Sequence, residues 1–376
     1  MKILFIVPSY KPAYIYGGPV VVIARLAEQL TLMGHQVEVY TTTANGDREL
    51  DIAANSTVMM DGVKVTYFKR ITGDHTHVSP ALWKAVWTNA GQFDKIHIHS
   101  WWNLLVIGAS FICKWKKLKP LLSPHGMFCD YVLTARNNRS KQLLHRAMGK
   151  RLLRSTYLHV SSELEWAECQ QVIKGWEGGL VFNLVALPEG SYTRTENSVF
   201  TISFLSRIDP KKGLDLLILA LSRVSFPYRL LIAGTGDDKY VRTLKTLIAS
   251  LDMSGNVEWV GWKGSGDKFD FLAGTDLFAL TSRNENFAIV VIEALYAGTP
   301  VLISDQVGLA GYVRDHDMGW VTSISTTEAI SDQLEEAYRD KLRRTYITRN
   351  APGRIRDDFN DARLASSYVQ LYKKYN

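Results

Sequence analysis

Short apolar runs alternate with helical patterns from one end of the chain to the other, and this alternation constrains the fold more than any other feature. An apolar run, a helix and a second apolar run form a βαβ unit, whose two strands are parallel. Parallel strands are covered on both faces, so their sequences are almost continuously apolar. The chain is therefore predicted to be an α/β protein with parallel sheets. The expected strands are KILFIV, VEVYTTT, VKVTYF, KIHIHS, PLLSP, YLHVSS and GLVFNL in the first half, and TISFLS, RLLIAG, VEWVG, DLFALT, VLIS and GWVTS in the second.

The length of 376 residues exceeds the size at which a single hydrophobic core usually keeps growing. We therefore expect two doubly wound, Rossmann-like domains that face each other across a cleft. A polar, turn-rich segment, LPEGSYTRTEN, separates the two series of strands and is the expected linker. The predicted domains are residues 1–190 and 191–358, and a final helix within residues 359–376 is expected to cross back to the first domain.

The positive charge of the chain lies in its first half. Residues 1–190 carry 21 Lys and Arg against 14 Asp and Glu, whereas the remaining residues are balanced. Residues 114–154 alone hold eleven basic residues and a single acid, Asp130. Within them, residues 136–155 show the pattern of a helix with a basic face, which suits an anionic membrane surface. A solvated helix face is the alternative, and nucleic-acid binding is not expected because no recognised binding module accompanies the charge.

The cysteines and the hydropathy point to a cytoplasmic protein. Cys113, Cys129 and Cys169 are odd in number and widely spaced, so they fit neither a disulfide framework nor a zinc site and favour a reducing compartment. The longest apolar run, residues 104–113, is far shorter than the roughly 20 residues that a membrane-spanning helix needs. The N-terminus is predicted to be a first strand rather than a secretory signal.

The stretch from Asp276 to Asp305 places two acidic residues within one βαβ unit. It contains a strand, a polar turn, a helix closed by Gly298 and a second strand. Glu285 lies where the turn enters the helix, a position at which any acid is favoured electrostatically. Glu293 lies inside an otherwise apolar helix, where a carboxylate is costly unless something pairs with it. Glu293 is therefore either a ligand-binding residue or a structural one that caps a backbone group or meets a buried arginine.

Glycine-rich turns follow two of the expected strands. Gly17 and Gly18 lie between the first strand and a helix, and Gly234 and Gly236 follow the strand RLLIAG. Glycines at the start of a helix let backbone N–H groups approach a phosphate. An ordinary turn is the alternative reading of Gly17 and Gly18.

Histidines gather near two expected strand ends. His125 follows the strand PLLSP, and the glycine after it lets a ligand come close. His97 and His99 precede a similar strand end, next to Trp101 and Trp102. The cluster indicates a cleft, although a single histidine in such a place is more often a core or surface residue. The spacing of the histidines does not match a metal site.

Two cations border the loop that follows the strand TISFLS. Arg207 ends this strand, and Lys212 opens the next helix. Such a pair suits a diphosphate, because it can neutralise the charge that develops on a departing phosphate. A solvated loop is the alternative.

Together these motifs resemble those of the retaining glycosyltransferases of the GT-B fold, in the large group called family 4. They follow the family's order over nearly the whole chain, and the Glu-x7-Glu helix combined with the Arg…Lys-Gly loop is the most specific part. The matching motifs are Gly17-Gly18-Pro19, His125-Gly126, Ser206-Arg207…Lys212-Gly213, Gly234-Thr235-Gly236, and Glu285-x7-Glu293 followed by Ala294-Leu295-Tyr296-Ala297-Gly298-Thr299-Pro300.

The resemblance implies a nucleotide-sugar donor, with UDP- or GDP-sugars expected, held mainly by the second domain. Arg207 and Lys212 would bind the diphosphate, Glu293 the ribose and Glu285 the sugar hydroxyls. His125 and Gly18 would come from the first domain across the cleft. The expected catalytic residues are His125, Arg207, Lys212 and Glu285, and the expected donor-binding residues are Gly17, Gly18, Arg207, Lys212, Gly234, Gly236, Asn286, Phe287, Ala288, Ile289 and Glu293.

The resemblance also implies transfer of a hexosyl unit with retention of configuration, by a front-face mechanism in which the leaving phosphate helps to deprotonate the acceptor. Neither a divalent metal nor a separate cofactor is expected, and Asp315-His316-Asp317 is interpreted as a chance match to a metal motif. The expected acceptor is a lipid-linked saccharide or a growing cell-surface polysaccharide of the exopolysaccharide, O-antigen or capsule type. The protein would meet it at the inner face of the cell membrane, with residues 114–154 as the docking surface.

Two departures from the family pattern stand out. The family usually has Gly-Phe-Gly after the first glutamate, whereas this chain has Asn286-Phe287-Ala288. Alanine is poorly suited to a left-handed backbone, so a different geometry is expected in this loop. The frequent Pro-Asn-Gly before the linker appears only as Phe182-Asn183-Leu184, a departure that concerns the exact domain boundary and not the function.

Two other classes of enzyme and a non-catalytic binding protein are the alternatives to the transferase. A dinucleotide-dependent oxidoreductase would share the Rossmann-like sheets, but GxGxxG after the first strand and an acid at the end of VEVYTTT are both missing. A nucleotide-sugar epimerase or hydrolase on the same fold stays open, because function must be argued from the site. A non-catalytic binding protein is disfavoured, because Arg207, Lys212, Glu285 and Glu293 are all present.

Overall fold

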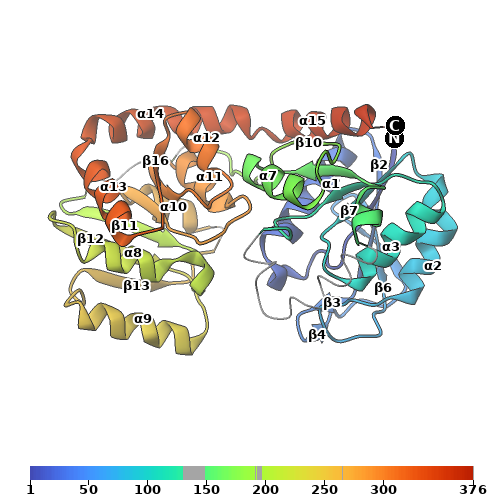
Figure 1. Cartoon of the computed structure of the whole chain (residues 1–376), viewed down its shortest axis with the longest axis horizontal. Helices are drawn as coiled ribbons and strands as arrows, with labels where there is room; N and C mark the ends of the chain where they lie inside the picture. The colour runs from blue at the N-terminus through green and yellow to red at the C-terminus, as the bar shows by residue number, and fades with distance from the viewer. Residues whose placement is uncertain (130–148, 191, 193–196, 265, 376) are drawn as a thin grey trace. The chain divides into compact units, whose positions relative to one another are not determined.

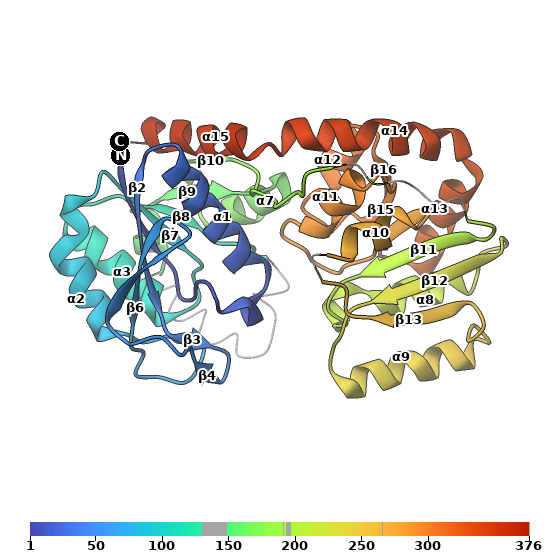
Figure 2. The same cartoon turned by 180° about the vertical axis from the view of Figure 1, so that it is seen from behind.

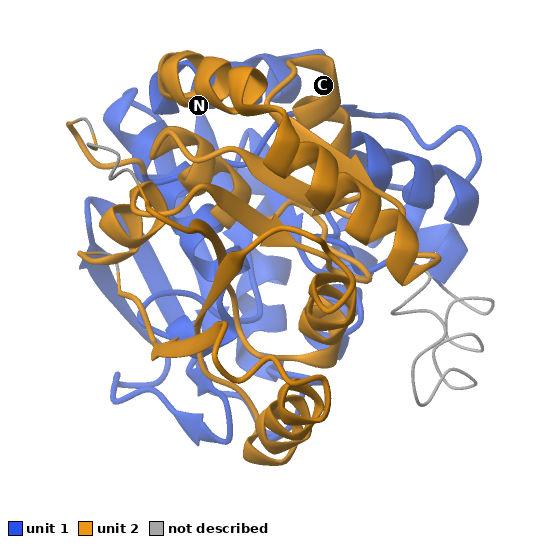
Figure 3. Ribbon diagram, turned by 90° about the vertical axis from the view of Figure 1, so that its left-hand side faces the viewer, with its two compact units in different colours: residues 1–186, 359–376 blue, residues 187–358 orange. Residues whose placement is uncertain are grey.

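The computed structural model describes residues 1–129, 149–190, 192, 197–264 and 266–375, and the chain divides into two compact units. Unit 1 comprises residues 1–186 and 359–376, and unit 2 comprises residues 187–358 (Figure 3). The change of unit falls a few residues before the position expected from the sequence. Much of the predicted basic helix, residues 130–148, lies outside the described residues.

Unit 1 contains, within the described residues, an eight-stranded sheet in the order β10-β9-β8-β7-β1-β2-β6-β5 (Figure 1). Neighbouring strands are parallel except β5 and β6, which are antiparallel. Strand β1 lies between β7 and β2, so the strand order reverses beside β1. The strands are β1 (Lys2–Ile6), β2 (Gln36–Thr42), β5 (Ser56–Met60), β6 (Val63–Phe68), β7 (Lys95–His99), β8 (Leu121–Ser123), β9 (Tyr157–Val160) and β10 (Gly178–Leu180), with a separate ribbon of β3 (Ala44–Asn45) and β4 (Arg48–Glu49).

The helices of unit 1 begin where their sequences supply a cap. Side-chain oxygens of Ser79, Asn103, Ser162 and Asn360 each accept a backbone N–H of the first turn, which satisfies a donor that the helix leaves unpaired. The helices are α1 (Gly18–Leu32), α2 (Pro80–Asn89), α3 (Leu104–Trp115), α6 (Lys150–Leu153), α7 (Glu163–Val172) and α15 (Asp361–Lys374), with the short 3-10 helices η1 (Tyr14–Tyr16) and η2 (Ala90–Gln92).

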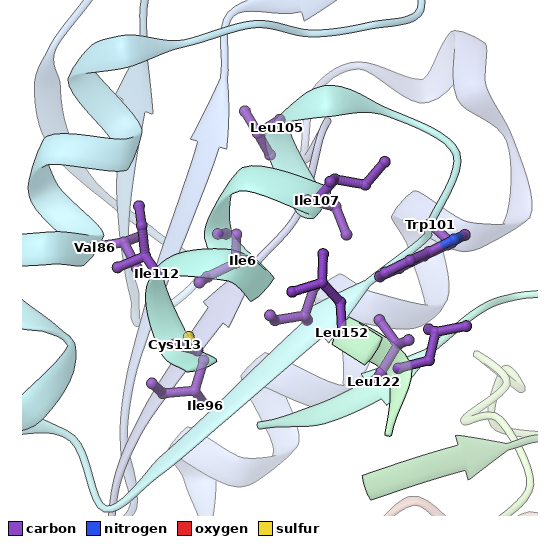
Figure 4. Packing of buried hydrophobic residues seen from close by; sticks show 14 of the residues in the cluster. Ile6, Val86, Ile96, Trp101, Leu105, Ile107, Ile112, Cys113, Leu122 and Leu152 are labelled. Carbon is purple, nitrogen blue, oxygen red and sulfur yellow. The ribbon is translucent and has the colours of Figure 1, made fainter. Parts of the chain in front are cut away.

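The hydrophobic core of unit 1 packs side chains of the sheet against α2, α3 and α6 (Figure 4). Ile6, Ile96 and Leu122 come from three neighbouring strands, and Leu105 and Ile112 come from α3. Burying a side chain of this size stabilises the fold by about 1.5–3 kcal/mol. The three cysteines are free and buried. Burial raises the pKa of Cys113 to about 12, so it acts as a small apolar side chain of this core.

Helix α15, the last of the chain, belongs to unit 1, where it packs against α1 (Figure 2). Arg25 of α1 forms an ion pair with Asp361 at the start of α15. Tyr372, near the other end of α15, is buried and bonds to His97 of β7. The helix is therefore fixed to the unit at both of its ends. No helix in the described ranges is both long and apolar enough to cross a lipid bilayer.

Unit 2 contains, within the described residues, a parallel six-stranded sheet in the order β13-β12-β11-β14-β15-β16. In chain order this is the 3-2-1-4-5-6 arrangement of a doubly wound fold, which reverses between β11 and β14. The predicted α/β class with parallel sheets is confirmed. The strands are β11 (Phe200–Leu205), β12 (Tyr228–Ala233), β13 (Val257–Gly261), β14 (Leu277–Leu280), β15 (Val301–Ser304) and β16 (Gly319–Thr322), and the helices are η4 (Pro210–Lys212), α8 (Leu214–Leu221), α9 (Asp238–Ser250), α10 (Lys268–Ala273), α11 (Ile289–Tyr296), α12 (Ala310–Asp315), α13 (Thr327–Arg339) and α14 (Lys341–Asp358).

Candidate functional site

In a doubly wound sheet, ligands bind beyond the carboxyl ends of the strands, where the strand order reverses. In unit 2 this point lies between β11 and β14, and the loops that follow these two strands are joined by several hydrogen bonds. The Thr281 hydroxyl donates to the carbonyl of Gly213 at 2.8 Å, and the Arg283 N–H donates to the carbonyl of Lys211 at 2.8 Å. The two loops therefore form one structural element, although they are far apart in the sequence.

Arg283 adds a bidentate ion pair to this connection. Its guanidinium bonds to the two carboxylate oxygens of Asp215 at 2.8 and 2.6 Å, and to the carbonyl of Pro210 at 2.6 Å. Burial acts to raise the pKa of Asp215, but the hydrogen bonds from Arg283 outweigh it and hold this pKa below its usual value. The sequence motifs did not reveal this pair, because neither residue belongs to a recognised pattern.

Lys212 and Glu285, both predicted as site residues, meet in an ion pair at the junction of the two loops. Their side chains are only 16% and 20% exposed. The backbone of Glu285 is fixed on both sides, because its N–H donates to the carbonyl of Gln306 at 2.9 Å and its carbonyl accepts the N–H of Gly308 at 2.8 Å. Arg207 is exposed on the loop after β11 and makes no hydrogen bond or ion pair with the residues described.

The glycines of this region allow backbones to approach closely. A Cβ at Gly234 would lie 1.8 Å from the carbonyl oxygen of Ser206, and one at Gly236 would lie 2.0 Å from that of Ile208. Gly213 has φ +69°, and its Cβ would lie 1.9 Å from the carbonyl oxygen of Thr281. The close contact between the loops after β11 and β12 therefore requires glycine at positions 234 and 236.

The loop before α11 differs from the expectation drawn from its sequence. Ala288 has φ +67° and ψ +72°, so it adopts the left-handed conformation that alanine was expected to avoid. Phe287 and Ala288 are buried, so surrounding packing holds a conformation that costs about 1–2 kcal/mol for a residue with a Cβ. The helix begins at Ile289, directly after Ala288.

Glu293 is 7% exposed on α11 and forms an ion pair with Lys268 of α10. The lysine side chain is 22% exposed, so the pair lies at the edge of the interior. The structural alternatives from the sequence were a backbone cap or a buried arginine, and the observed side-chain partner is a lysine instead. Lys268 belongs to no motif, and nothing in the sequence pairs it with Glu293.

The first predicted turn of unit 1 does require a glycine. Gly17 has φ +74° and ψ −143°, a conformation open to few other residues, and it precedes the fifteen-residue helix α1. Gly18 is the first residue of that helix. A Cβ at Gly17 would meet no atom within 4 Å, so the backbone conformation alone requires the glycine.

Histidines at the strand ends of unit 1 form a chain of hydrogen bonds with a fixed direction. The carbonyl of Val181 can only accept, so His159 donates to it from Nε2 at 3.0 Å. His159 Nδ1 then accepts from the Ser123 hydroxyl at 2.6 Å, and Ser123 accepts from His97 Nε2 at 2.6 Å. The Tyr372 hydroxyl donates to His97 Nδ1 at 2.8 Å. Burial lowers the pKa of His159 to about 4 and that of His97 well below its usual value.

His125 lies at the end of this cluster, with φ +54°. Its Nε2 is 3.1 Å from Nδ1 of His99, and the two ring planes differ by 13°. The N–H of Gly126 donates to the carboxylate of Glu165 at 2.7 Å. Burial lowers the pKa of His125 to about 3, so the ring is neutral at physiological pH. Glu165 and His159 were not among the predicted site residues.

Trp101 is one of the two tryptophans next to the histidines that indicated a cleft. It is 1% exposed and belongs to the hydrophobic core, so it is not available to line an acceptor site. Trp102 is partly buried, and its indole N–H donates to the carbonyl of Met127 at 2.6 Å.

In unit 2, Asp317 is ion-paired with Arg343 at 2.6 Å. This contact gives the second aspartate of the Asp-His-Asp sequence a structural partner.

Comparison with protein families gives two matches that follow one another along the chain. Residues 16–168 match the model described as Glycosyltransferase Family 4, and residues 193–354 match the model described as Glycosyl transferases group 1. Each model corresponds to one of the two units. Together the two models account for most of the chain.

Individual relatives match parts of the sequence. A lipopolysaccharide core biosynthesis glycosyltransferase, LpsE of Rhizobium meliloti, is 27% identical over 56% of this chain, and the match spans 59% of that relative. A phosphatidyl-myo-inositol mannosyltransferase of Mycobacterium leprae is 31% identical over 46% of each chain. Among solved structures, Anabaena HepE in complex with UDP and glucose is similar over the whole of both chains, with a TM-score of 0.72 and 18% identity. This structural likeness shows a common fold, the GT-B fold.

Proposed function

The chain belongs to the group 1 glycosyltransferases of family 4, and from this premise we propose that it transfers a hexosyl unit from a nucleoside-diphosphate sugar to a saccharide acceptor. The observation that carries this proposal is the meeting of Lys212 and Glu285 where the strand order of unit 2 reverses. A cation and an acid held there by fixed loops suit a substrate that has both a diphosphate and sugar hydroxyls.

Lys212 and Arg207 are assigned to the diphosphate. Lys212 is half-buried and its loop is fixed by Arg283, so its ammonium group is preorganised. Arg207 is exposed on the same loop and supplies a second positive charge. As the bond to the sugar breaks, negative charge grows on the departing phosphate, and fixed cations stabilise this charge more than that of the intact donor. The turn of Gly234 and Gly236 adjoins this loop and would offer its backbone to the phosphates.

Glu285 is assigned to the sugar hydroxyls, together with the backbone of residues 286–289. Its carboxylate is engaged by Lys212, which fits a group that orients the donor better than one that attacks it. We therefore propose transfer with retention of configuration by the front-face route, in which a phosphate oxygen of the leaving group takes the proton of the acceptor. The route as proposed requires neither a metal ion nor a cofactor.

Glu293 is assigned to the ribose of the donor. Lys268 fixes the position of its carboxylate, and a carboxylate accepts hydrogen bonds from two neighbouring hydroxyls without competing donors. The paired lysine also lowers the cost of keeping the charge in a mostly buried place. In unit 1, Gly17 and Gly18 lie at the start of α1 and His125 lies two residues after β8, and we assign all three to the same reaction.

The choice of donor and acceptor rests on the relatives. A solved structure of HepE contains UDP-glucose, which supports a UDP-sugar, and a GDP-sugar is the second candidate. The names of LpsE and of the mannosyltransferase refer to a lipopolysaccharide core and to a phosphoinositide. We therefore propose a lipid-linked saccharide or a growing cell-surface polysaccharide as the acceptor.

The test is a transfer assay with UDP- and GDP-hexoses and a lipid-linked acceptor extract, with and without EDTA. We expect one donor to give product at the same rate in EDTA, and the new linkage to keep the α configuration of the donor. A product of β configuration would contradict retention, and a rate abolished by EDTA and restored by Mg²⁺ would contradict metal independence. Sugar release without transfer would favour the hydrolase.

A surface of unit 1 supports the proposed contact with an anionic membrane. Helices α2 and α3 contain no acidic residue, and they expose Trp87, Phe111 and Trp115. The two helices pack against each other in Figure 1, and Lys116 lies 5.3 Å from the Trp87 ring, which joins them at the surface. We call this surface the aromatic-basic face; it consists of Lys84, Trp87, Phe111, Lys114, Trp115, Lys116 and Lys117.

Exposed tryptophans among lysines are typical of proteins that lie on anionic lipid surfaces. We therefore propose that the protein is cytoplasmic and docks on the inner face of the cell membrane through this face and the remainder of residues 114–154. Wild-type protein should sediment with anionic vesicles at low salt, and Trp115→Ser should weaken this binding. Trp262 of unit 2 is also 68% exposed, so Trp262→Ser is the matched control and should bind as the wild type does. Equal binding to neutral vesicles, or equal loss in both variants, would contradict the proposal.

A further inference from the structure

We propose that His99 and Glu165 are positioning residues that hold His125 as a fixed hydrogen-bond donor, with its proton on Nδ1 and Gly126 anchored beside it. The inference rests on the proposed function only for the role of His125 in transfer. The proton positions and the anchoring of Gly126 follow from contacts within unit 1 alone. Neither residue belongs to a motif that suggested the activity.

One proton is shared in the hydrogen bond between His99 and His125. His99 is 1% exposed, and its Nε2 is buried with no hydrogen-bond partner among the described residues. A buried N–H without an acceptor is rarer in proteins than a buried acceptor without a donor. The proton of His99 therefore lies on Nδ1, from which it donates to Nε2 of His125 at 3.1 Å.

The proton on Nδ1 of His99 determines which nitrogen of His125 is protonated. A neutral imidazole carries one proton, and Nε2 of His125 is occupied as an acceptor. The proton of His125 must then lie on Nδ1, which makes no hydrogen bond with the described residues. His125 thus presents an N–H donor to its surroundings. It does not need to titrate to do so.

The ring of His99 is itself held in place. Phe5 of β1 packs against it with ring centroids 5.0 Å apart, and His97 packs at 4.0 Å. His97 is fixed in turn by its bonds to Ser123 and Tyr372. Rotation of His99 would break contacts with both neighbours, so its nitrogen stays directed at His125.

Glu165 fixes the backbone on the other side of His125. Its carboxylate is 2% exposed and accepts the N–H of Gly126 at 2.7 Å. The second oxygen accepts the N–H of Ser161 at 2.9 Å and its hydroxyl at 3.3 Å. Glu165 therefore links the turn after β8 to the end of β9. His125 and Gly126 both have positive φ, at +54° and +74°, and this link helps to keep them there.

The direct test reads the proton positions and does not depend on activity. In protein labelled with 15N-histidine, two-bond 15N–1H correlations distinguish protonated from bare ring nitrogens, and His125→Gln identifies the signals of His125. We expect a protonated Nδ1 and a bare Nε2 in His125 at pH 7.5. A proton on Nε2 of His125 would overturn the proposal, even if the enzyme is fully active.

Kinetics tests whether the positioning matters for transfer. His99→Leu removes the donor to His125, whereas the side-chain amide of His99→Asn can supply an N–H near the position of Nδ1. We expect His99→Leu to lower kcat/KM on the order of 100-fold, the cost of a misplaced reacting group, and His99→Asn to restore most of it. Equal losses in both variants, with the same melting temperature as the wild type, would overturn the proposal.

Glu165→Gln keeps the shape of the side chain but turns an amide NH2 toward one of the two backbone N–H groups. We expect a lower kcat with KM for the donor little changed, and a normal value in Glu163→Gln, an exposed acid on the same helix. Wild-type kinetics in Glu165→Gln would overturn the role of Glu165. If the wild type itself transfers no sugar, the proposed function fails, while the histidine spectrum still decides this inference.

Discussion

The buried histidine chain makes the stability of unit 1 depend on pH in a way that can be calculated for one residue. His159 is 2% exposed, and burial lowers its pKa from 6.5 to about 4 in the folded protein. In the folded chain its two nitrogens are used as one acceptor and one donor. Protonation would put a second N–H against the hydroxyl hydrogen of Ser123.

The sign of the effect follows from proton linkage. Below pH 6.5 the unfolded state binds a proton at His159 that the folded state does not, so the stabilisation is complete above this pH and is lost as the pH falls toward 4. From pH 7.5 to pH 5.0 the loss from this residue is about 2 kcal/mol. The same loss corresponds to about a 30-fold rise in the population of the unfolded, exchange-competent state.

The assay is amide hydrogen exchange in β8 and β9, corrected for the intrinsic exchange rate at each pH. We compare the wild type with His159→Gln, which can still donate to Val181 but does not titrate. The wild type should lose about 30-fold more protection than the variant between pH 7.5 and 5.0. His75→Gln, at an exposed position, should behave as the wild type does. Equal losses in the wild type and His159→Gln would refute the reasoning.

Three further predictions concern unit 2. Lys212→Ala should lower kcat more than it raises KM, because the ammonium stabilises charge that develops on the leaving phosphate; an effect confined to KM in steady-state kinetics would assign Lys212 to ground-state binding. Glu293→Ala should weaken donor binding and turnover, and unchanged kinetics would remove Glu293 from the site. Ala288→Gly should raise the melting temperature slightly, because the relief of about 1 kcal/mol of left-handed strain exceeds the cost of the added entropy of the unfolded chain. A clearly lower melting temperature would show that the lost contacts of the methyl group matter more.

Much of the fold was predictable because its information is local. The apolar runs of the parallel strands are continuous, so β1, β11 and β15 could be placed from the sequence within a residue or two. The backbone conformation of the residue before a helix was harder to predict. The helix after β14 begins at Ile289 because Ala288 is held in a left-handed conformation by packing, which no local pattern reports.

The candidate site was predictable only where a motif existed. Lys212 and Glu285 were identified from their loops, and the structure brings them together. Lys268 was missed because the residues around it show no special pattern, and only the packing of α10 on α11 places it beside Glu293. His159 was missed for a similar reason. Its partners come from β8 and from residue 181, and an isolated histidine in an apolar strand gives no sign of them.

The most direct test of the central claim is the thermal stability of the protein with UDP, GDP, ADP and their common sugar conjugates, measured with and without EDTA. A ligand that binds only the folded state raises the melting temperature. At a free ligand concentration 100 times its Kd, it adds about 2.7 kcal/mol to the free energy of unfolding. We predict a clear shift with one nucleotide, unchanged by EDTA and reduced in Lys212→Ala. The absence of a shift with every nucleotide, together with a shift with NAD(H), would contradict the account and favour an oxidoreductase.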